Sequence, residues 1–174
     1  MDIPRLCLTL QALALAALLT FAGGAHVYAE GSEEDQPAPL PSVAETIDEA
    51  RLLLAIGHFD EVLPVLRAHL EAGSSDTDLF FLLGLAAAGK VQSVQVPTSE
   101  RQALLDEAVA AFGAVLDARP DYVRARIELA TTFFLMEEDQ TARRHFELAL
   151  AEQLPSWVAE HIRLFLAKMD DRRR

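Results

Sequence analysis

Apolar residues recur along most of the chain at spacings of three and four, which predicts a series of amphipathic helices. The clearest pattern lies within residues 108–150. Ala108, Phe112 and Leu116 reappear 34 residues later as Ala142, Phe146 and Leu150. Residues four apart share one face of a helix, so each copy predicts one helix with a single apolar face.

The predicted helices are separated by residues that begin or end helices. Ser42 and Glu45 form a capping-box pattern at the start of the first helix. Gly57 interrupts the pattern after that helix, and the run Gly73-Ser74-Ser75 interrupts it after the second. Prolines precede the later helices, and the last helix begins at Pro155-Ser156. The pattern therefore predicts pairs of helices joined by tight turns.

One connection is expected to be longer than the others. Leu116 lies 46 residues after the equivalent Leu70, which is 12 more than the period of 34. The extra residues fall in 89–99, a polar and β-branched stretch with a proline, and predict an inserted loop. Ser99 and Gln102 then form a second capping-box pattern. Such an insertion is either a contact loop or a tolerated surface loop.

A 34-residue period of helix–turn–helix units is typical of tetratricopeptide (TPR) repeats. We therefore expect an all-α TPR solenoid with about three repeats and a C-terminal capping helix. In TPR proteins the first helices of the repeats line the concave side. This register predicts nine partner-binding residues: Ile47, Arg51, Leu54, Phe81, Leu85, Arg124, Ile127, Thr131 and Phe134. Most are apolar, which suits a hydrophobic segment of another polypeptide. A register shift by one residue would instead place some of them in the core.

The N-terminal part predicts export. Residues 6–22 are almost wholly apolar, and Val27-Tyr28-Ala29 offers a small-residue cleavage site, so residues 1–29 are interpreted as a signal peptide. An uncleaved membrane anchor is the alternative, but the run is shorter than the roughly 20 residues that a span needs. Residues 30–42 are acidic and proline-rich and predict a disordered linker before the TPR domain at 43–174. In a Gram-negative host the mature protein would be periplasmic.

Candidate chemistry is sparse. The net charge of −12 disfavours sequence-independent binding to nucleic acid. Gly84…Gly89-Lys90-Val91 nearly matches a P-loop, but valine replaces the Ser or Thr that binds magnesium. The sole cysteine, Cys7, lies in the apolar N-terminal run and excludes a disulfide framework.

The histidines show no metal-binding spacing, and His69 and His145 lie on or beside packing faces, where a buried neutral imidazole is expected. We therefore expect a protein-binding module with no cofactor, metal or small-molecule substrate, rather than an enzyme. A catalytic alternative would need a clustered His or Ser with a perturbed pKa.

Three C-terminal segments resemble a particular family, the Slam proteins (surface lipoprotein assembly modifiers). They are Pro120-Asp121-x-Val123-Arg124-x-Arg126-Ile127-Glu128-Leu129-Ala130, Ala142-Arg143-Arg144-His145-Phe146 and Leu154-Pro155…Val158…Ile162…Phe165-Leu166. Slam proteins carry a periplasmic N-terminal TPR domain and a C-terminal outer-membrane barrel, and they move lipoproteins to the cell surface. The sequence ends at Arg174, where the barrel of that family would begin. The resemblance therefore implies the soluble module of a longer protein, or a free-standing module that works beside a separate barrel.

The expected function follows from both arguments. The concave groove would dock a partner or client polypeptide without making or breaking a covalent bond. The resemblance implies that this partner is a surface-destined lipoprotein or an outer-membrane barrel protein. The alternative is a general scaffold for envelope assembly, or a TPR adaptor, with no link to lipoproteins.

Overall fold

The computed structural model describes residues 39–93 and 96–174, which form one compact unit. The predicted signal peptide at 1–29 and most of the predicted linker at 30–42 lie outside the described residues. Within the described part of the chain all regular structure is helical, which confirms the all-α prediction. The seven helices are α1 (Val43–Ala55), α2 (Phe59–Glu71), α3 (Thr77–Ser93), α4 (Thr98–Ala118), α5 (Val123–Leu135), α6 (Asp139–Leu150) and α7 (Ser156–Arg172). No helix in these residues combines the length and the apolar character needed to cross a membrane.

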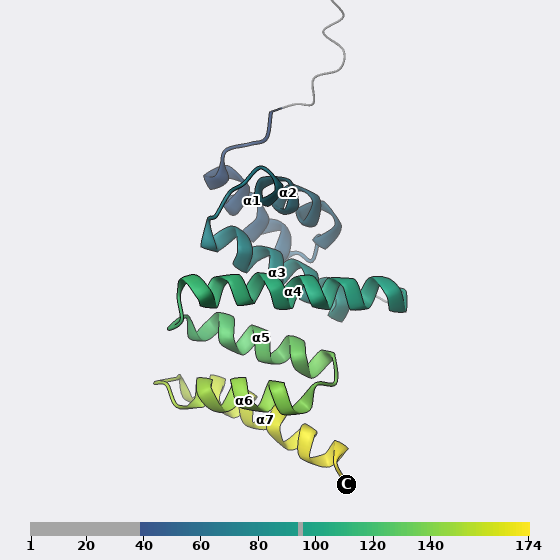
Figure 1. The fold of residues 1–174 in the computed structure, drawn as a ribbon, viewed down its shortest axis with the longest axis vertical. Coiled ribbons are helices and arrows are strands. Elements are labelled where there is room, and N and C mark those ends of the chain that lie inside the picture. The colour runs from purple at the N-terminus through teal and green to yellow at the C-terminus, as the bar shows by residue number, and fades with distance from the viewer. Residues whose placement is uncertain (1–38, 94–95) are drawn as a thin grey trace, which may run out of the picture. The chain divides into compact units, whose positions relative to one another are not determined.

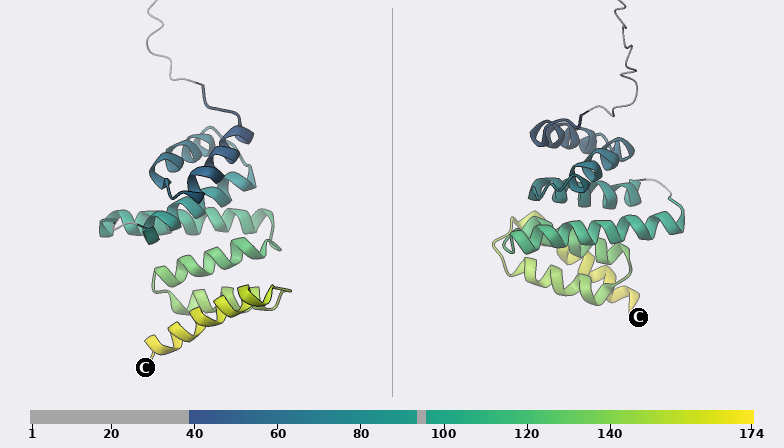
Figure 2. Two further views of the ribbon diagram at one scale, coloured as in Figure 1. Left: turned by 180° about the vertical axis from the view of Figure 1, so that it is seen from behind. Right: turned by 45° about the horizontal axis from the view of Figure 1, so that its top comes forward.

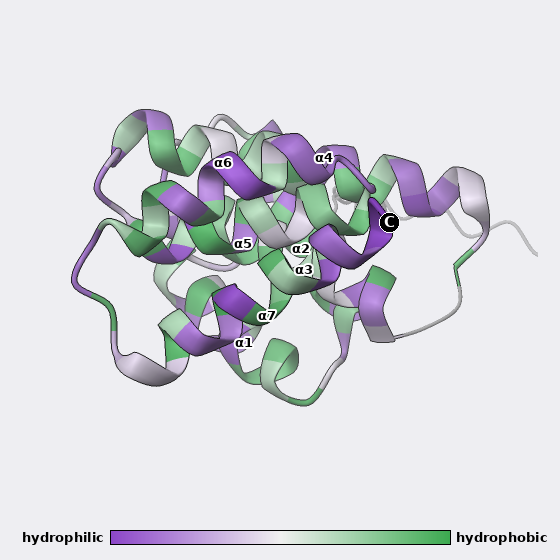
Figure 3. Ribbon diagram, turned by 90° about the horizontal axis from the view of Figure 1, so that it is seen from below, coloured by the Kyte–Doolittle hydropathy of each residue, from purple (hydrophilic) through white to green (hydrophobic). Residues whose placement is uncertain are grey.

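Within this unit the helices follow one another as a stack of hairpins (Figures 1 and 2). Each helix packs against the next one along the chain, as short helix–helix connections require. In addition, α1 contacts α3, and α3 contacts α5, so the alternate helices also form a continuous layer. Apolar and polar residues share most of the helices (Figure 3), whereas α3 has buried residues on every side and forms the centre of the first core cluster.

The predicted helix ends in the first half of the unit are confirmed. The Ser42 hydroxyl accepts a hydrogen bond from the Glu45 amide at 3.3 Å, and the Ser42 amide donates to the Glu45 carboxylate at 3.0 Å. Gly57 and Gly73 follow α1 and α2 with φ angles of 80° and 89°. That left-handed conformation is accessible to glycine without the steric cost that a Cβ brings.

The predicted bounds of the loop at 89–99 are wrong. Helix α3 continues to Ser93 and α4 begins at Thr98, so most of the extra residues lengthen these two helices. Ser99 lies inside α4, whose N-cap is Pro97, and the second capping box is therefore wrong as well. The reason is tertiary packing: Val91 is buried, and the Lys90 ammonium lies 2.7 Å from both Asp60 and Glu100. These contacts outweigh the weak helix propensity of the segment.

The 34-residue repeat of the sequence corresponds to a repeat of burial. Ala108 and Ala142 are completely buried, and so are Phe112 and Phe146 four residues later. The first Ala/Phe pair belongs to a core cluster formed by α1 to α5, and the second belongs to a cluster formed by α5, α6 and α7. The equivalent residues of the two copies are thus core residues, those of α4 in the first cluster and those of α6 in the second.

Glycines allow two of the helix contacts to be close. A Cβ added to Gly84 on α3 would lie 2.6 Å from a ring carbon of Phe112 on α4, so the ring occupies the space of a side chain. A Cβ on Gly89 would likewise lie 2.6 Å from the ring of Phe59, the first residue of α2. Gly89 therefore seats the start of α2 against α3.

Candidate binding groove

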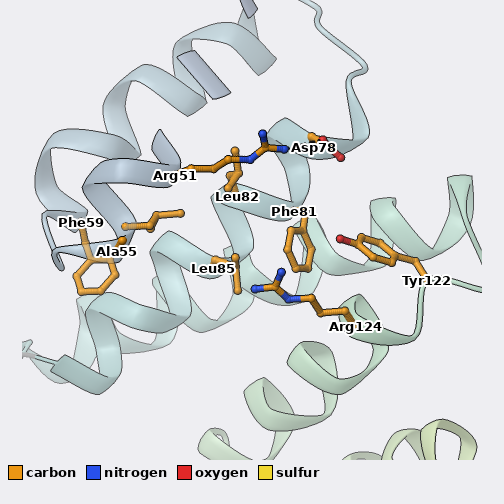
Figure 4. A pocket seen from close by; sticks show the side chains of 10 residues that line it. Arg51, Ala55, Phe59, Asp78, Phe81, Leu82, Leu85, Tyr122 and Arg124 are labelled. Atoms are coloured by element: carbon orange, nitrogen blue, oxygen red, sulfur yellow. Dashed lines mark hydrogen bonds and ion pairs between the residues drawn. The ribbon is translucent and has the colours of Figure 1, made fainter. Parts of the chain in front are cut away.

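A cavity of about 490 Å³ lies on the layer formed by α1, α3 and α5 (Figure 4). We call it the groove. It is open to solvent, and its volume lies in the range typical of ligand sites. The groove is lined by Arg51, Leu54, Ala55, Phe59, Asp78, Phe81, Leu82, Leu85, Tyr122 and Arg124.

Five of the nine sequence-predicted partner-binding residues line the groove together: Arg51, Leu54, Phe81, Leu85 and Arg124. They come from the first, third and fifth helices, as the register predicted. The other four, Ile47, Ile127, Thr131 and Phe134, do not line it. Ile47 packs against the first core cluster and Ile127 against the second.

Helix α7 explains why Phe134 is not part of an open surface. Phe134 is only 8% exposed, and its ring makes an edge contact with Phe165 of α7 at a centroid distance of 5.0 Å. The Thr131 hydroxyl, one turn earlier, donates to the carbonyl of Ile127 in its own helix at 3.0 Å. The concave face predicted at the C-terminal end of α5 is thus covered by α7 at Phe134.

Sequence reasoning missed the other half of the lining. Asp78 and Leu82 stand at helical spacing with Phe81 and Leu85, so their shared face was visible in the sequence. Ala55 is one residue after Leu54 at the end of α1. Phe59 and Tyr122 lie at or before the start of α2 and α5, and no local pattern places them beside α3.

A shared carboxylate organises one side of the groove. Asp78 accepts a hydrogen bond from Arg51 at 3.2 Å and one from Arg119 at 3.1 Å, with a different oxygen facing each guanidinium. Arg51 lies on α1, Asp78 on α3, and Arg119 directly after α4. The three side chains are partly exposed, so the pairs add little free energy, but they fix the two arginines at the edge of the groove.

From Arg119 a row of contacts leads to Arg124, with two adjacent aromatic rings between the two guanidinium groups. The Arg119 guanidinium lies over the Tyr122 ring at 4.6 Å, and the centroids of Tyr122 and Phe81 are 5.1 Å apart. The Arg124 guanidinium then lies 5.0 Å from the centroid of Phe81. We call these four residues the arginine–aromatic row. Phe81 is itself held by a tilted contact with Phe112 at 5.8 Å. Each cation faces the negative π-face of a ring, which is an attractive arrangement.

The histidines singled out by the sequence belong to the packing. His69 is buried, and its Nε2 lies 2.8 Å from the Thr46 hydroxyl across the α1–α2 contact. His145 stacks on Phe133 at 5.6 Å. Burial lowers the pKa of His145, and the charges of Arg144 and Arg126 lower it further, which favours the neutral ring that the sequence predicted.

The chemistry of the lining determines which ligand groups the groove can bind. In residues 39–93 and 96–174 no group of three or more His, Cys, Asp or Glu side chains is placed to hold a metal ion. The groove combines an apolar floor of Leu54, Leu82 and Leu85 with guanidinium groups at its edge. Such a lining can hold apolar groups by burial and anionic groups by charge-assisted hydrogen bonds.

Comparison of the chain with models of known protein families gives no match, and comparison with curated proteins gives none either.

Proposed function

We propose that this chain is a TPR-type helical-repeat protein that binds a segment of a partner polypeptide in the groove. The observation that carries this proposal is the lining itself. Side chains from α1, α3 and α5 meet around one open cavity of about 490 Å³ with an apolar floor. A polypeptide segment can bury its own apolar side chains on such a floor.

The repeat assignment is supported by the period and by what occupies its positions. The 34-residue offset joins Ala108 to Ala142 and Phe112 to Phe146, and all four are buried. Gly84 admits the ring of Phe112 between two paired helices. Small and aromatic residues at fixed positions are typical of the TPR pattern.

The cellular part of the proposal depends on the sequence. The predicted signal peptide at 1–29 favours a role in the cell envelope, in the periplasm of a Gram-negative host. The resemblance to the TPR domain of Slam proteins covers residues 42 to about 169 and is strongest after residue 101. It favours a client among surface-destined lipoproteins, or a partner among outer-membrane barrel proteins. Binding in this role makes and breaks no covalent bond.

A peptide selection tests the binding function. A random peptide library displayed on phage is panned on the full chain and, in parallel, on Ala55→Trp and Ala44→Trp. Both alanines are exposed on α1, but only Ala55 lines the groove, so a tryptophan there fills the groove while Ala44→Trp is a matched control. We expect peptides that bind the wild-type chain and Ala44→Trp but not Ala55→Trp. Peptides that bind all three chains equally, or no enriched peptide at all, would contradict the proposal.

A second experiment tests the envelope role. Benzoylphenylalanine is placed at position 55 or, as the control, at position 44, and cells that express the chain are irradiated. We expect lipoproteins or outer-membrane proteins among the adducts at position 55 and their absence at position 44. Adducts of cytoplasmic proteins alone would refute the envelope assignment and leave the binding function standing.

A further inference from the structure

The charges around the groove are not balanced. Asp78 is the only carboxylate among the described residues that line the groove, and it accepts hydrogen bonds from both Arg51 and Arg119. Arg124 enters the groove from α5 and forms no ion pair or hydrogen bond with any acid among the described residues. A guanidinium without an anionic partner thus faces an open cavity in a chain whose net charge is −12.

Arg124 is also held in position. Its guanidinium lies over the ring of Phe81, and that ring is fixed by Phe112 and Tyr122. The cation–π contact uses none of the guanidinium N–H groups in a hydrogen bond to a carboxylate, so they are available as donors. In Figure 4 the Arg124 side chain extends along the cavity toward Leu85 and Phe81. A side chain that is already positioned loses little conformational freedom when a ligand binds.

The neighbouring carboxylate on α5 does not fill this role. Glu128 lies one turn after Arg124, and burial raises its pKa, although the charges of Arg124 and His161 act in the opposite direction. Burial thus weakens the tendency of Glu128 to neutralise Arg124.

The surroundings of Arg124 define the ligand more closely. Leu82 and Leu85 of α3 line the same cavity, and so does Leu54 of α1. A carboxylate at Arg124 would therefore stand next to an apolar pocket. One unpaired guanidinium fork matches one carboxylate, which an aspartate or glutamate side chain supplies. The acidic chain as a whole repels a long polyanion such as nucleic acid, so charge complementarity is local and favours a short acidic site within a polypeptide.

We propose that Arg124 reads an internal aspartate or glutamate of the partner segment, and that Leu54, Leu82 and Leu85 hold an apolar side chain next to it. This inference rests on the proposed binding function and specifies its ligand: an acidic–apolar polypeptide segment that crosses the groove. Phe81 acts as the platform that positions Arg124. Asp78 keeps Arg51 and Arg119 occupied, so the acidic residue of the ligand is directed to Arg124.

The test uses the peptides selected above. For each peptide that requires an open groove, three forms are synthesised: the original, a form with Asp and Glu replaced by Asn and Gln, and a form with an amidated C-terminus. Their affinities are measured by fluorescence anisotropy for wild-type chain, Arg124→Gln, Arg124→Lys and Arg163→Gln. Arg163 is exposed on α7 and lies outside the groove, so it controls for the change in net charge. Thermal unfolding by circular dichroism confirms that the variants fold.

We expect the wild-type chain to bind the original acidic peptide about 10- to 100-fold more tightly than the Asn/Gln form. This ratio corresponds to the free energy of one hydrogen bond to a charged group. This preference should vanish in Arg124→Gln, be smaller in Arg124→Lys, and persist in Arg163→Gln. It should also weaken as salt is added. The lysine variant separates the guanidinium fork from charge alone.

Several outcomes would overturn the inference. Groove-dependent peptides without acidic residues, or equal affinities of the original and Asn/Gln forms, would refute the acidic ligand. Either result would leave the proposed binding function standing. A preference that survives in Arg124→Gln would assign the acid to another residue. Loss of binding on C-terminal amidation alone would show that the groove binds a C-terminal carboxylate and not an internal acidic side chain. If no peptide depends on an open groove, the inference and the proposed function both fall.

Discussion

The guanidinium of Arg172 lies over the ring of Phe134, 4.1 Å from its centroid, and joins the last helix to the middle of the stack. The same guanidinium donates to the Phe134 carbonyl at 3.4 Å and to the Asp139 carboxylate at 3.0 Å. One side chain of α7 therefore contacts the C-terminal end of α5 and the first turn of α6. A positive charge near the C-terminus of α5 also interacts favourably with the dipole of that helix.

Replacing Arg172 should loosen this end of the unit. We expect Arg172→Gln to lower the free energy of unfolding by about 1 kcal/mol, since the guanidinium is partly exposed and its contacts are individually weak. Urea denaturation measures the change, and hydrogen exchange should show faster opening of α7. Arg173→Gln is the control, because that side chain is exposed. Equal stabilities of the two variants would show that the Arg172 contacts are not stabilising.

The contact of Gly84 with Phe112 predicts opposite effects for two glycine substitutions. Gly84→Ala should destabilise the chain by about 1–3 kcal/mol, because the new methyl group would meet the completely buried Phe112 ring. Gly113→Ala, in α4, meets no atom within 4 Å and should stabilise the chain by roughly 0.5–1 kcal/mol through helix propensity. Thermal unfolding gives both values.

A second-site change checks the cause of the Gly84 effect. Phe112→Leu should lose less stability in the Gly84→Ala background than in the wild-type chain, because the smaller side chain leaves room for the methyl group. Simple additivity of the two changes would place the strain of Gly84→Ala elsewhere.

The buried pair of Thr46 and His69 predicts a coupling energy. Thr46→Val keeps the shape but removes the hydroxyl that lies 2.8 Å from the His69 ring nitrogen. We expect a cost of about 1–3 kcal/mol, because a buried polar atom loses its partner. In a double-mutant cycle with His69→Phe, the double variant should cost less than the sum of the two single changes. An additive result would show that the two residues do not interact.

The burial of Glu128 predicts a stability that depends on pH. Burial raises the pKa of Glu128 in the folded chain above its ordinary value of 4.5, and the charges of Arg124 and His161 only partly oppose this. The folded chain therefore holds a proton that the unfolded chain releases between pH 4.5 and the raised pKa. Stability from the protonated carboxyl is fully present below pH 4.5 and is lost as the pH rises through the folded pKa.

Glu128→Gln should accordingly be more stable than the wild-type chain at pH 7, and the difference should shrink toward acidic pH. Melting temperatures across the pH range measure it. Glu147→Gln is the control, since Glu147 is exposed on α6. A Glu128→Gln chain that is less stable than wild type at neutral pH would mean that attraction to Arg124 outweighs burial.

The sequence by itself determined the features that depend on neighbours along the chain. The capping box at Ser42 and the left-handed turns at Gly57 and Gly73 follow from residues within one helical turn, so local chemistry specifies them. The equivalence of Phe112 and Phe146 was also visible, because a buried helix face leaves a periodic apolar pattern. The same periodicity brought half of the groove lining together from three separate helices.

Tertiary structure decided what depends on residues far apart in the chain. Residues 89–93 are helical because Val91 is buried and Lys90 pairs with Asp60 on α2 and Glu100 on α4, and neither acid belongs to the helix of Lys90. Phe134 has the spacing of a groove residue, yet the return of α7 covers it with Phe165 and Arg172. The position of Arg124 over Phe81 depends in the same way on the packing of α5 against α3. Helical periodicity fixes which face of a helix is apolar, but only the packed chain determines which part of that face remains open.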